Sequence, residues 1–398
     1  MAASPPALPL PTGSCGRAGP DRRSDRLREM KITDVTLTLF AWKDIPATSY
    51  GRHTGRFSGS SDLGLLTLRT DDGLEGHAFL GSAMRPASMD GQSLIRYLKP
   101  LVLGQDPLER ERLWQSLWQR NRSTTIRAIG AVDVALWDLG GKIANLPVHR
   151  LLGSYRTRIH AYASSAVLPS PEAYAEEAVS FKANGWRAYK IHPPTEPVVD
   201  IQVCRAVRRA VGDDYRLMLD STWAYEYPDA VRVGKEVEAL GFHWYEDPLA
   251  DDDLYNYVKL KQQLSIPILA TEYTPGGFTA LAPWIVAHAT DYLRGDPAVK
   301  GGITPLVKSA HLAEAFHMSF EVHHGGNSLN NVANLHVIMA IKNTELFEVL
   351  LPAGAQKYGL AEDIDVDRDG YVYAPEKPGL GATIDFDLIA RRKTAMLS

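Results

Sequence analysis

A regular series of ionisable residues runs through the second half of the sequence. It begins with a lysine and a histidine two positions apart, and from the first aspartate onward its members follow at intervals of 24 to 27 residues. Each interval holds one strand and one helix, so parallel strands would carry the series to one end of a barrel, where TIM-barrel active sites are built. A single acid there would be an ordinary helix cap, but a regular series indicates a site. The series consists of Lys190, His192, Asp220, Glu246, Glu272, Asp296, His323 and Glu348.

Three members of the series are carboxylates on consecutive predicted strands. Asp220, Glu246 and Glu272 each follow an apolar run, namely LML, WY and ILAT. Three oxygen donors suit Mg²⁺, which commonly keeps waters or substrate oxygens as its other ligands. The absence of cysteine and histidine from the trio disfavours zinc. Without a cation, three bunched carboxylates would raise one another's pKa, so we predict a magnesium site.

Two histidines at the end of one predicted strand have different expected roles. Asp296 and His323 lie on adjacent strands, where the aspartate can accept the imidazole Nδ1–H and leave Nε2 facing the barrel mouth. His324 should point the other way, because side chains alternate along a strand, and we expect a buried structural role for it.

The second predicted strand carries a lysine and a histidine on one face. Lys190 can neutralise an oxygen of a substrate carboxylate, and His192 is a plausible base near neutral pH. Together with His323, this gives two candidates for the group that removes a proton. Glu348, on the last strand, either hydrogen-bonds the developing enediolate or pairs with a neighbour.

Eight short apolar segments after Gly153 supply the strands that this arrangement needs. Most are followed by a helical stretch, which is typical of a parallel α/β barrel. The predicted strands span residues 159–164, 187–192, 216–221, 243–248, 266–273, 291–296, 319–324 and 346–349.

The part of the chain before Gly153 has a different organisation. Alternating strands, including a hairpin around Asp71-Asp72-Gly73, precede helical patterns, which predicts an α+β domain. We expect residues 30–153 to form this capping domain, completed by residues 355–398, and residues 154–354 to form the barrel. Residues 1–29 are rich in Pro, Ala, Gly and Ser and are predicted to be a disordered extension.

Composition excludes several classes of partner. The 398 residues include 45% hydrophobic and 23% charged side chains, with a formal net charge of -4. Such a chain has no basic footprint for nucleic acid, and no apolar stretch is long enough to span a membrane. Its two cysteines, Cys15 and Cys204, form no disulfide framework, which fits a cytoplasmic protein.

A polar segment of the predicted capping domain is a candidate for substrate selection. It contains Tyr50, Arg52, His53 and Arg56, which suit a polyhydroxylated or dicarboxylic substrate better than an aromatic one, although a solvated loop would have the same composition.

These residues and their flanking motifs resemble the enolase superfamily, in its mandelate racemase subgroup. The resemblance covers roughly residues 31 to 390 and rests on AVDVALWDLGGKIANLPVHRLLG (131–153), GWRAYKIH (185–192), LMLDS, YEDPL, ATEY and GDPAVKGGITPL (295–306). It implies a (β/α)₇β barrel with an N-terminal α+β capping domain, a Mg²⁺ cofactor and a small-molecule carboxylate substrate, and by analogy a homo-oligomer. It also implies that Asp220, Glu246 and Glu272 bind the metal and that Asp296 and His323 form the dyad.

One position departs from the family pattern. Many relatives carry lysine, any residue and lysine on the second strand, whereas this sequence has Lys190-Ile191-His192. No lysine can therefore be the base there, although histidine supports the same chemistry. We predict a dehydratase of a sugar acid, in which one histidine removes the proton α to the carboxylate and water is lost to give a 2-keto-3-deoxy acid.

Three alternatives compete with a dehydratase. Within the same chemistry, reprotonation would give a racemase or epimerase, and an anhydro sugar acid would give a cycloisomerase. A metal-free aldolase would use Lys190 as a Schiff-base nucleophile, but the three nearby carboxylates disfavour it. A non-catalytic barrel predicts the loss of site residues such as Asp220, Glu246, Glu272 or His323, and all are present.

Overall fold

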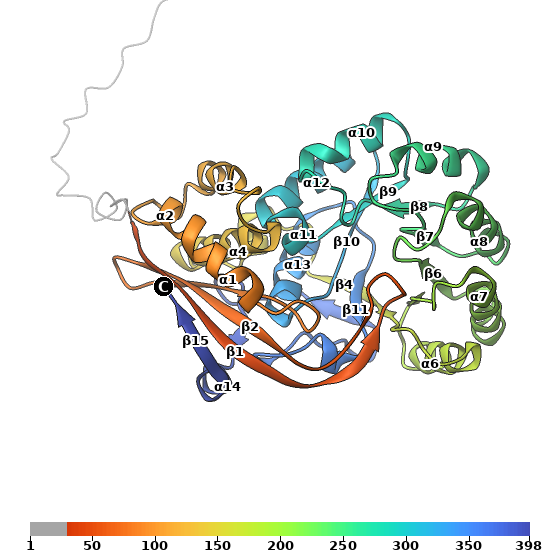
Figure 1. Ribbon diagram of the computed structural model, residues 1–398, viewed down its shortest axis with the longest axis horizontal. Helices are drawn as coiled ribbons and strands as arrows, with labels where there is room; N and C mark the ends of the chain where they lie inside the picture. The colour runs from red at the N-terminus through yellow and green to blue at the C-terminus, as the bar shows by residue number, and fades with distance from the viewer. Residues whose placement is uncertain (1–29) are drawn as a thin grey trace, which may run out of the picture.

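The computed structural model describes residues 30–398, and the predicted disordered extension lies outside these residues. Figure 1 shows an antiparallel sheet and a group of helices beside a larger ring of alternating strands and helices. No helix among residues 30–398 has the length and apolar character to cross a membrane.

The antiparallel sheet joins the two ends of the described chain. Its strand order is β15-β1-β2-β3, so the C-terminal strand pairs with the first strand. The predicted hairpin lies between β2 and β3, where Gly73 has a φ of 87° that suits glycine. The strands are β1 (Ile32–Ser49), β2 (Arg56–Thr70), β3 (Glu75–Leu80) and β15 (Lys393–Leu397).

Helix α4 (Ile126–Ala144) connects this sheet with the barrel. Thr125 caps its first turn by accepting a hydrogen bond from the Ala128 amide, and it ends at Asn145 in a left-handed conformation. Close packing on β3 requires Gly76, because a Cβ there would lie 2.3 Å from the Ala135 carbonyl oxygen. Four shorter helices lie in the same part of the chain, namely α1 (Ser88–Tyr97), α2 (Lys99–Val102), α3 (Arg110–Trp118) and α5 (Val148–Leu151).

All eight predicted barrel strands are present, and seven consecutive pairs are parallel neighbours in the order β10-β9-β8-β7-β6-β5-β4-β11. The barrel is nearly closed, since within the described chain β10 and β11 share no ladder. The strands are β4 (Arg158–Ser164), β5 (Ala188–Ile191), β6 (Arg216–Asp220), β7 (Trp244–Glu246), β8 (Ile268–Ala270), β9 (Tyr292–Gly295), β10 (Ser319–Val322) and β11 (Phe347–Leu350).

Helices cover the outside of these strands, which explains why the strands read as continuous apolar runs. They are α6 (Pro171–Ala183), α7 (Pro197–Val211), α8 (Tyr227–Ala239), α9 (Leu254–Gln263), α10 (Leu281–Val286), α11 (Pro297–Lys300), α12 (Ile303–Ala315) and α13 (Ser328–Ala340).

After β11 the chain returns to the antiparallel sheet. β13 pairs with the beginning of β4, and β12 pairs with β14 in a small separate sheet. These last elements are β12 (Leu360–Glu362), β13 (Tyr371–Tyr373), β14 (Thr383–Ile384) and α14 (Phe386–Arg392).

Candidate active site

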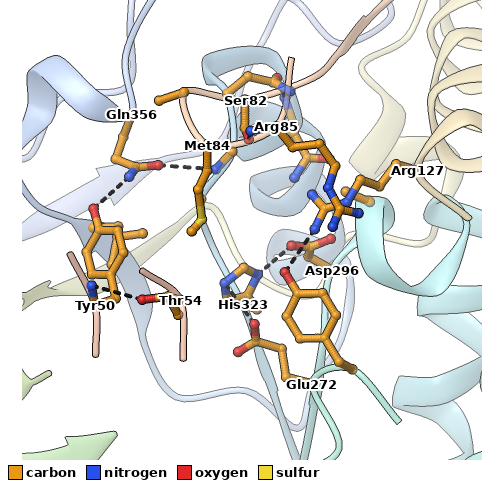
Figure 2. A pocket seen from close by; sticks show the side chains of 18 of the residues that line it. Tyr50, Thr54, Ser82, Met84, Arg85, Arg127, Glu272, Asp296, His323 and Gln356 are labelled. Atoms are coloured by element: carbon orange, nitrogen blue, oxygen red, sulfur yellow. Dashed lines mark hydrogen bonds and ion pairs between the residues drawn. The ribbon is translucent and has the colours of Figure 1, made fainter. Parts of the chain in front are cut away.

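A cavity of about 510 Å³ lies between the carboxyl ends of the barrel strands and the N-terminal part of the chain. Its volume is in the range of small-molecule sites. Figure 2 shows the wall formed by both parts, with Tyr50 and Arg85 from N-terminal segments and Glu272, Asp296 and His323 from the barrel. Every member of the ionisable series except Glu246 lines this cavity, and Glu246 is fully buried beside them.

The carboxylate trio surrounds two buried cations. Lys190 Nζ lies 3.0 Å from Asp220 Oδ2 and 2.8 Å from Glu246 Oε1. Arg294, near the end of β9, places its Nε 2.7 Å from Glu246 Oε1 and 3.2 Å from Glu272 Oε2. Neighbouring carboxylates of the trio therefore share a cation, Asp220 and Glu246 through Lys190, and Glu246 and Glu272 through Arg294.

Glu348 completes this cluster from the last strand. Its two oxygens lie 2.8 Å from Lys190 Nζ and 2.5 Å from Arg294 Nη2. Of the two roles open for Glu348, the structure shows pairing with neighbouring cations. Burial alone would raise the pKa of this carboxyl, but Arg294 and Lys190 hold it well below its usual range.

The cluster carries more negative than positive charge. Among residues 30–398, no three His, Cys, Asp or Glu side chains are gathered so as to hold a metal ion, because Lys190 and Arg294 lie between the carboxylates. Those two cations nevertheless face four carboxylates. Burial, with the charges of Asp220 and Glu348, raises the pKa of Glu246 to about 8 despite Arg294 and Lys190. An all-oxygen donor set with this excess negative charge fits a divalent cation such as Mg²⁺.

His323 and Asp296 are paired as the sequence suggested. His323 Nδ1 lies 2.5 Å from Asp296 Oδ2, and Nε2 faces Glu272 Oε1 at 3.3 Å (Figure 2). Burial would lower the pKa of His323, but Glu272 and Asp296 outweigh it and raise the pKa. The His323 side chain keeps 17% of its surface exposed, so its ring can reach a ligand in the cavity.

His192 lies on the opposite side of the barrel mouth. Its Nδ1 lies 2.7 Å from the carbonyl oxygen of Ser165, and its Nε2 lies 2.9 Å from Asp220 Oδ2. Both oxygens can only accept hydrogen bonds, so this arrangement fits a ring that carries a proton on each nitrogen. The edge of the Tyr50 ring packs on His192 with the centroids 5.1 Å apart.

His324 is excluded from the cavity. Its ring is fully buried against Phe347, 4.2 Å away between centroids, and burial lowers its pKa to about 3. Its backbone amide donates to Glu348 Oε2 at 3.1 Å, which helps to position that carboxylate. This is the structural placement that side-chain alternation predicts.

The four candidates from the capping segment separate into two pairs. Tyr50 and His53 line the cavity, and the Tyr50 hydroxyl donates to the Leu351 carbonyl oxygen at 2.6 Å. Arg52 and Arg56 do not line it. The Arg52 guanidinium donates to the carbonyl oxygen of Ala224, and Arg56 is exposed at the start of β2.

Sequence reasoning missed several residues of the site. Arg294 stands on β9 two positions before Asp296, and this spacing, which brings side chains of extended backbone to one side, could have revealed it. The others come from loops, from α4 and from the first turn of α13, where no periodic signal marks a cavity wall. They include Ser82, Met84, Arg85, Arg127, Thr222, Trp223, Tyr273, Asn327, Asn330 and Gln356.

Known proteins match most of the described chain. Residues 173–388 match the family model "Enolase C-terminal domain-like", and residues 52–153 match "Mandelate racemase / muconate lactonizing enzyme, N-terminal domain". The chain is similar to the crystal structure of D-glucarate dehydratase from Agrobacterium tumefaciens complexed with magnesium, with 36% sequence identity and a TM-score of 0.84. The match covers 92% of this chain and 100% of that chain.

Curated relatives include dehydratases and cycloisomerases. Arabinonate dehydratase of Saccharolobus solfataricus is 27% identical over 80% of this chain and 87% of its own length. D-galactarolactone cycloisomerase of Agrobacterium fabrum is 27% identical over 90% of this chain and 98% of its own length. Together with the fold and the family models, these likenesses show that the chain is an enolase-superfamily enzyme and belongs to the mandelate racemase/muconate lactonizing enzyme family.

Proposed function

We propose that this protein is a magnesium-dependent dehydratase of a sugar acid, either an aldonate or an aldarate. It removes the proton α to the carboxylate and eliminates the β-hydroxyl as water, which gives a 2-keto-3-deoxy acid. The observation that carries this proposal is the placement of the Asp296–His323 pair, His192 and the carboxylate cluster around one cavity. The sugar-acid dehydratases among the relatives support it.

Asp220, Glu246 and Glu272 are the proposed ligands of Mg²⁺. When bound, the ion supplies Lewis-acid stabilisation of the negative charge that develops on the substrate carboxylate. Lys190 adds a preorganised positive charge on the same side of the cavity, since its side chain is only 1% exposed and its Nζ is held by Asp220, Glu246 and Glu348.

His323 is the proposed base and His192 the proposed acid. Asp296 fixes the His323 tautomer, so Nε2 can accept the α-proton and the resulting imidazolium is stabilised by the aspartate. His192 has acceptors at both ring nitrogens and can donate its Nε2 proton to the departing β-hydroxyl. The enol left after loss of water then takes up a proton at the β-carbon to give the keto acid.

Unpartnered polar atoms on the cavity wall favour a hydroxylated substrate. Thr222 Oγ1, Trp223 Nε1 and Asn330 Nδ2 are buried and have no hydrogen-bond partner among residues 30–398. Buried polar groups normally find a partner, so ligand hydroxyls would satisfy them. An aromatic substrate would leave them unpaired.

A cycloisomerase or racemase is the second candidate, favoured by the cycloisomerase among the relatives and by the histidine at position 192. The same base would remove the same α-proton. The reaction would then differ in what leaves the β-carbon, or in the face on which the proton returns.

A substrate screen separates these reactions. The purified protein is incubated with MgCl₂ and a panel of aldonates, aldarates and their lactones, and products are read by a semicarbazide assay and by NMR. We expect a keto acid from at least one acid sugar, lost on chelation with EDTA and restored by MgCl₂. An inverted or ring-opened product without any keto acid would replace the dehydratase by the second candidate.

A further inference from the structure

Two arginines line the cavity on the side of the barrel opposite Lys190. Lys190 lies on β5, whereas Asp296 and His323 follow β9 and β10, four and five places along the ring. Figure 2 shows the side chains of Arg85 and Arg127 beside Asp296. Arg85 comes from the loop after β3 and Arg127 from the first turn of α4.

The positive charges of this pair are not neutralised by direct ion pairs within the described chain. Neither Arg85 nor Arg127 forms an ion pair with any residue of the described range 30–398. Asp90 is a carboxylate whose pKa responds to both arginines. Burial raises this pKa, and Arg85 and Arg127 lower it. Asp296, which also faces Arg127, is already paired with His323. Both guanidinium groups therefore lack a direct carboxylate partner among residues 30–398.

The Arg127 guanidinium is held in place by an aromatic neighbour. Its Nη2 donates to the Tyr273 hydroxyl at 3.1 Å, and its Cζ lies 5.9 Å from the centroid of that ring. Tyr273 in turn packs edge-on against Trp223, with centroids 5.1 Å apart. This contact uses one of the five guanidinium N–H donors and leaves the others for a ligand.

We propose that Arg85 and Arg127 form a subsite for a second carboxylate, so that the substrate is a sugar diacid, an aldarate, rather than an aldonate. This rests on the proposed function, in which the reacting carboxylate is bound near Lys190. A planar guanidinium matches a carboxylate in a two-point hydrogen-bonded pair, and two arginines from different segments would hold the far end of an extended chain. The hydroxyl groups between the two ends would face Thr222, Trp223 and Asn330.

Binding without turnover tests the subsite. A His323→Asn protein, loaded with MgCl₂, is titrated by calorimetry with matched pairs that differ only at the far carbon, such as galactarate with galactonate and glucarate with gluconate. We expect at least one diacid to bind about 10- to 100-fold more tightly than its monoacid, the effect of a hydrogen bond to a charged group. Arg127→Met and Arg85→Met should each remove most of this preference while changing monoacid binding little.

Three controls make the outcome decisive. Arg127→Lys keeps the charge and should retain part of the preference for diacids. Because Arg85 is exposed, Arg85→Met tests the subsite even where Arg127→Met impairs folding. Arg122→Met removes a nearby exposed arginine outside the cavity and should change nothing. 6-Phosphogluconate tests a phosphate in place of the second carboxylate.

Each contrary outcome would overturn a different part of the proposal. Equal affinity for diacids and monoacids, or an Arg127→Met variant that weakens both equally, would remove the diacid subsite and leave the dehydratase standing. Tighter binding of 6-phosphogluconate than of every diacid would reassign the subsite to phosphate. Absence of binding by all sugar acids would remove the proposed function together with the subsite.

Discussion

Arg294 is a fully buried guanidinium that contacts three carboxylates, those of Glu246, Glu272 and Glu348. Burial alone would lower its pKa, but Glu246 and Glu348 outweigh that effect and raise it. Removing one partner of a buried ionic group commonly costs about 3–5 kcal/mol, because the remaining charges are left uncompensated. The cluster therefore depends on Arg294 for folding stability, and a divalent cation bound by the carboxylates would compete with it for the same oxygens.

We predict that Arg294→Met lowers the free energy of unfolding by about 3–5 kcal/mol and that MgCl₂ restores more stability to the variant than to the parent. Urea unfolding with and without MgCl₂ measures both effects. Arg208→Met is a matched control, since within residues 30–398 the buried Arg208 guanidinium donates only to backbone carbonyls, such as those of Leu240 and Tyr215. An equal magnesium effect in the two variants would contradict a shared charge balance at the cluster.

The two histidines differ in the step that each should control. His323→Asn removes the proposed base, so turnover should fall by about 10²- to 10⁴-fold and exchange of the α-proton with D₂O should be lost. His192→Gln removes the proposed acid, so elimination should fall while exchange continues. NMR of the substrate in D₂O measures the exchange directly. Exchange retained in His323→Asn but lost in His192→Gln would assign the base to His192.

At the scale of elements, the sequence predicted the barrel strands because all are short apolar runs and all but the first end in or beside an ionisable residue. Metal-ligand candidates such as Asp220 and Glu246 could be predicted from the sequence for the same reason. Arg85 and Arg127 could not, because their place depends on how a loop and α4 dock on the barrel. Arg52 is the opposite case. The sequence predicted it as a substrate-binding candidate, but its guanidinium donates a hydrogen bond to a backbone carbonyl oxygen.

The docking of α4 on the barrel uses a carboxylate of α4 to cap the first turn of α12. Asp133 of α4 accepts hydrogen bonds from the Thr304 amide at 2.9 Å and the Thr304 hydroxyl at 2.7 Å, in the first turn of α12. Gly302 is required beside it, since a Cβ there would lie 2.2 Å from Asp133 Oδ2. Burial raises the pKa of Asp133 to about 7, although Thr304 lowers it.

This raised pKa predicts a pH dependence of stability. The folded carboxyl binds its proton more tightly than the unfolded one, whose pKa is about 3.9, so its contribution is fully present below pH 4 and is lost as pH rises through 7. Asp133→Asn does not titrate, so the stability advantage of the parent over this variant should shrink between pH 5 and pH 8. Urea unfolding at both pH values measures it, with the exposed Asp213→Asn as a control. A constant difference would show that Asp133 stays ionised throughout.

At the scale of the whole molecule, the cavity belongs to both parts of the chain. The barrel supplies the ionisable series, whereas the connection after β1, the loop after β3 and α4 supply the facing wall. The ends of the described chain are tied to that wall, because β15 pairs with β1 from Leu37 to Phe40. The boundaries at residues 153 and 355, a homo-oligomeric state and a cytoplasmic location stay predictions.

The pairing of the chain ends predicts that a distant deletion affects substrate binding selectively. Truncation after Arg392 removes β15, leaves the β1 edge unpaired and exposes apolar surface on Leu37, for a loss of about 2–4 kcal/mol. Because β1 continues to the segment that places Tyr50 in the cavity, we expect KM for the sugar acid to rise about 10-fold or more.

The same truncation should leave the affinity for Mg²⁺ nearly unchanged, because the proposed metal ligands follow β6, β7 and β8 of the barrel. Calorimetric titration with MgCl₂ and steady-state kinetics on one preparation measure the two properties separately. Met396→Lys is the matched control, since this exposed side chain can change while the strand stays paired. Loss of magnesium binding in parallel with substrate binding would mean that the barrel mouth itself needs the antiparallel sheet to keep its carboxylates in place.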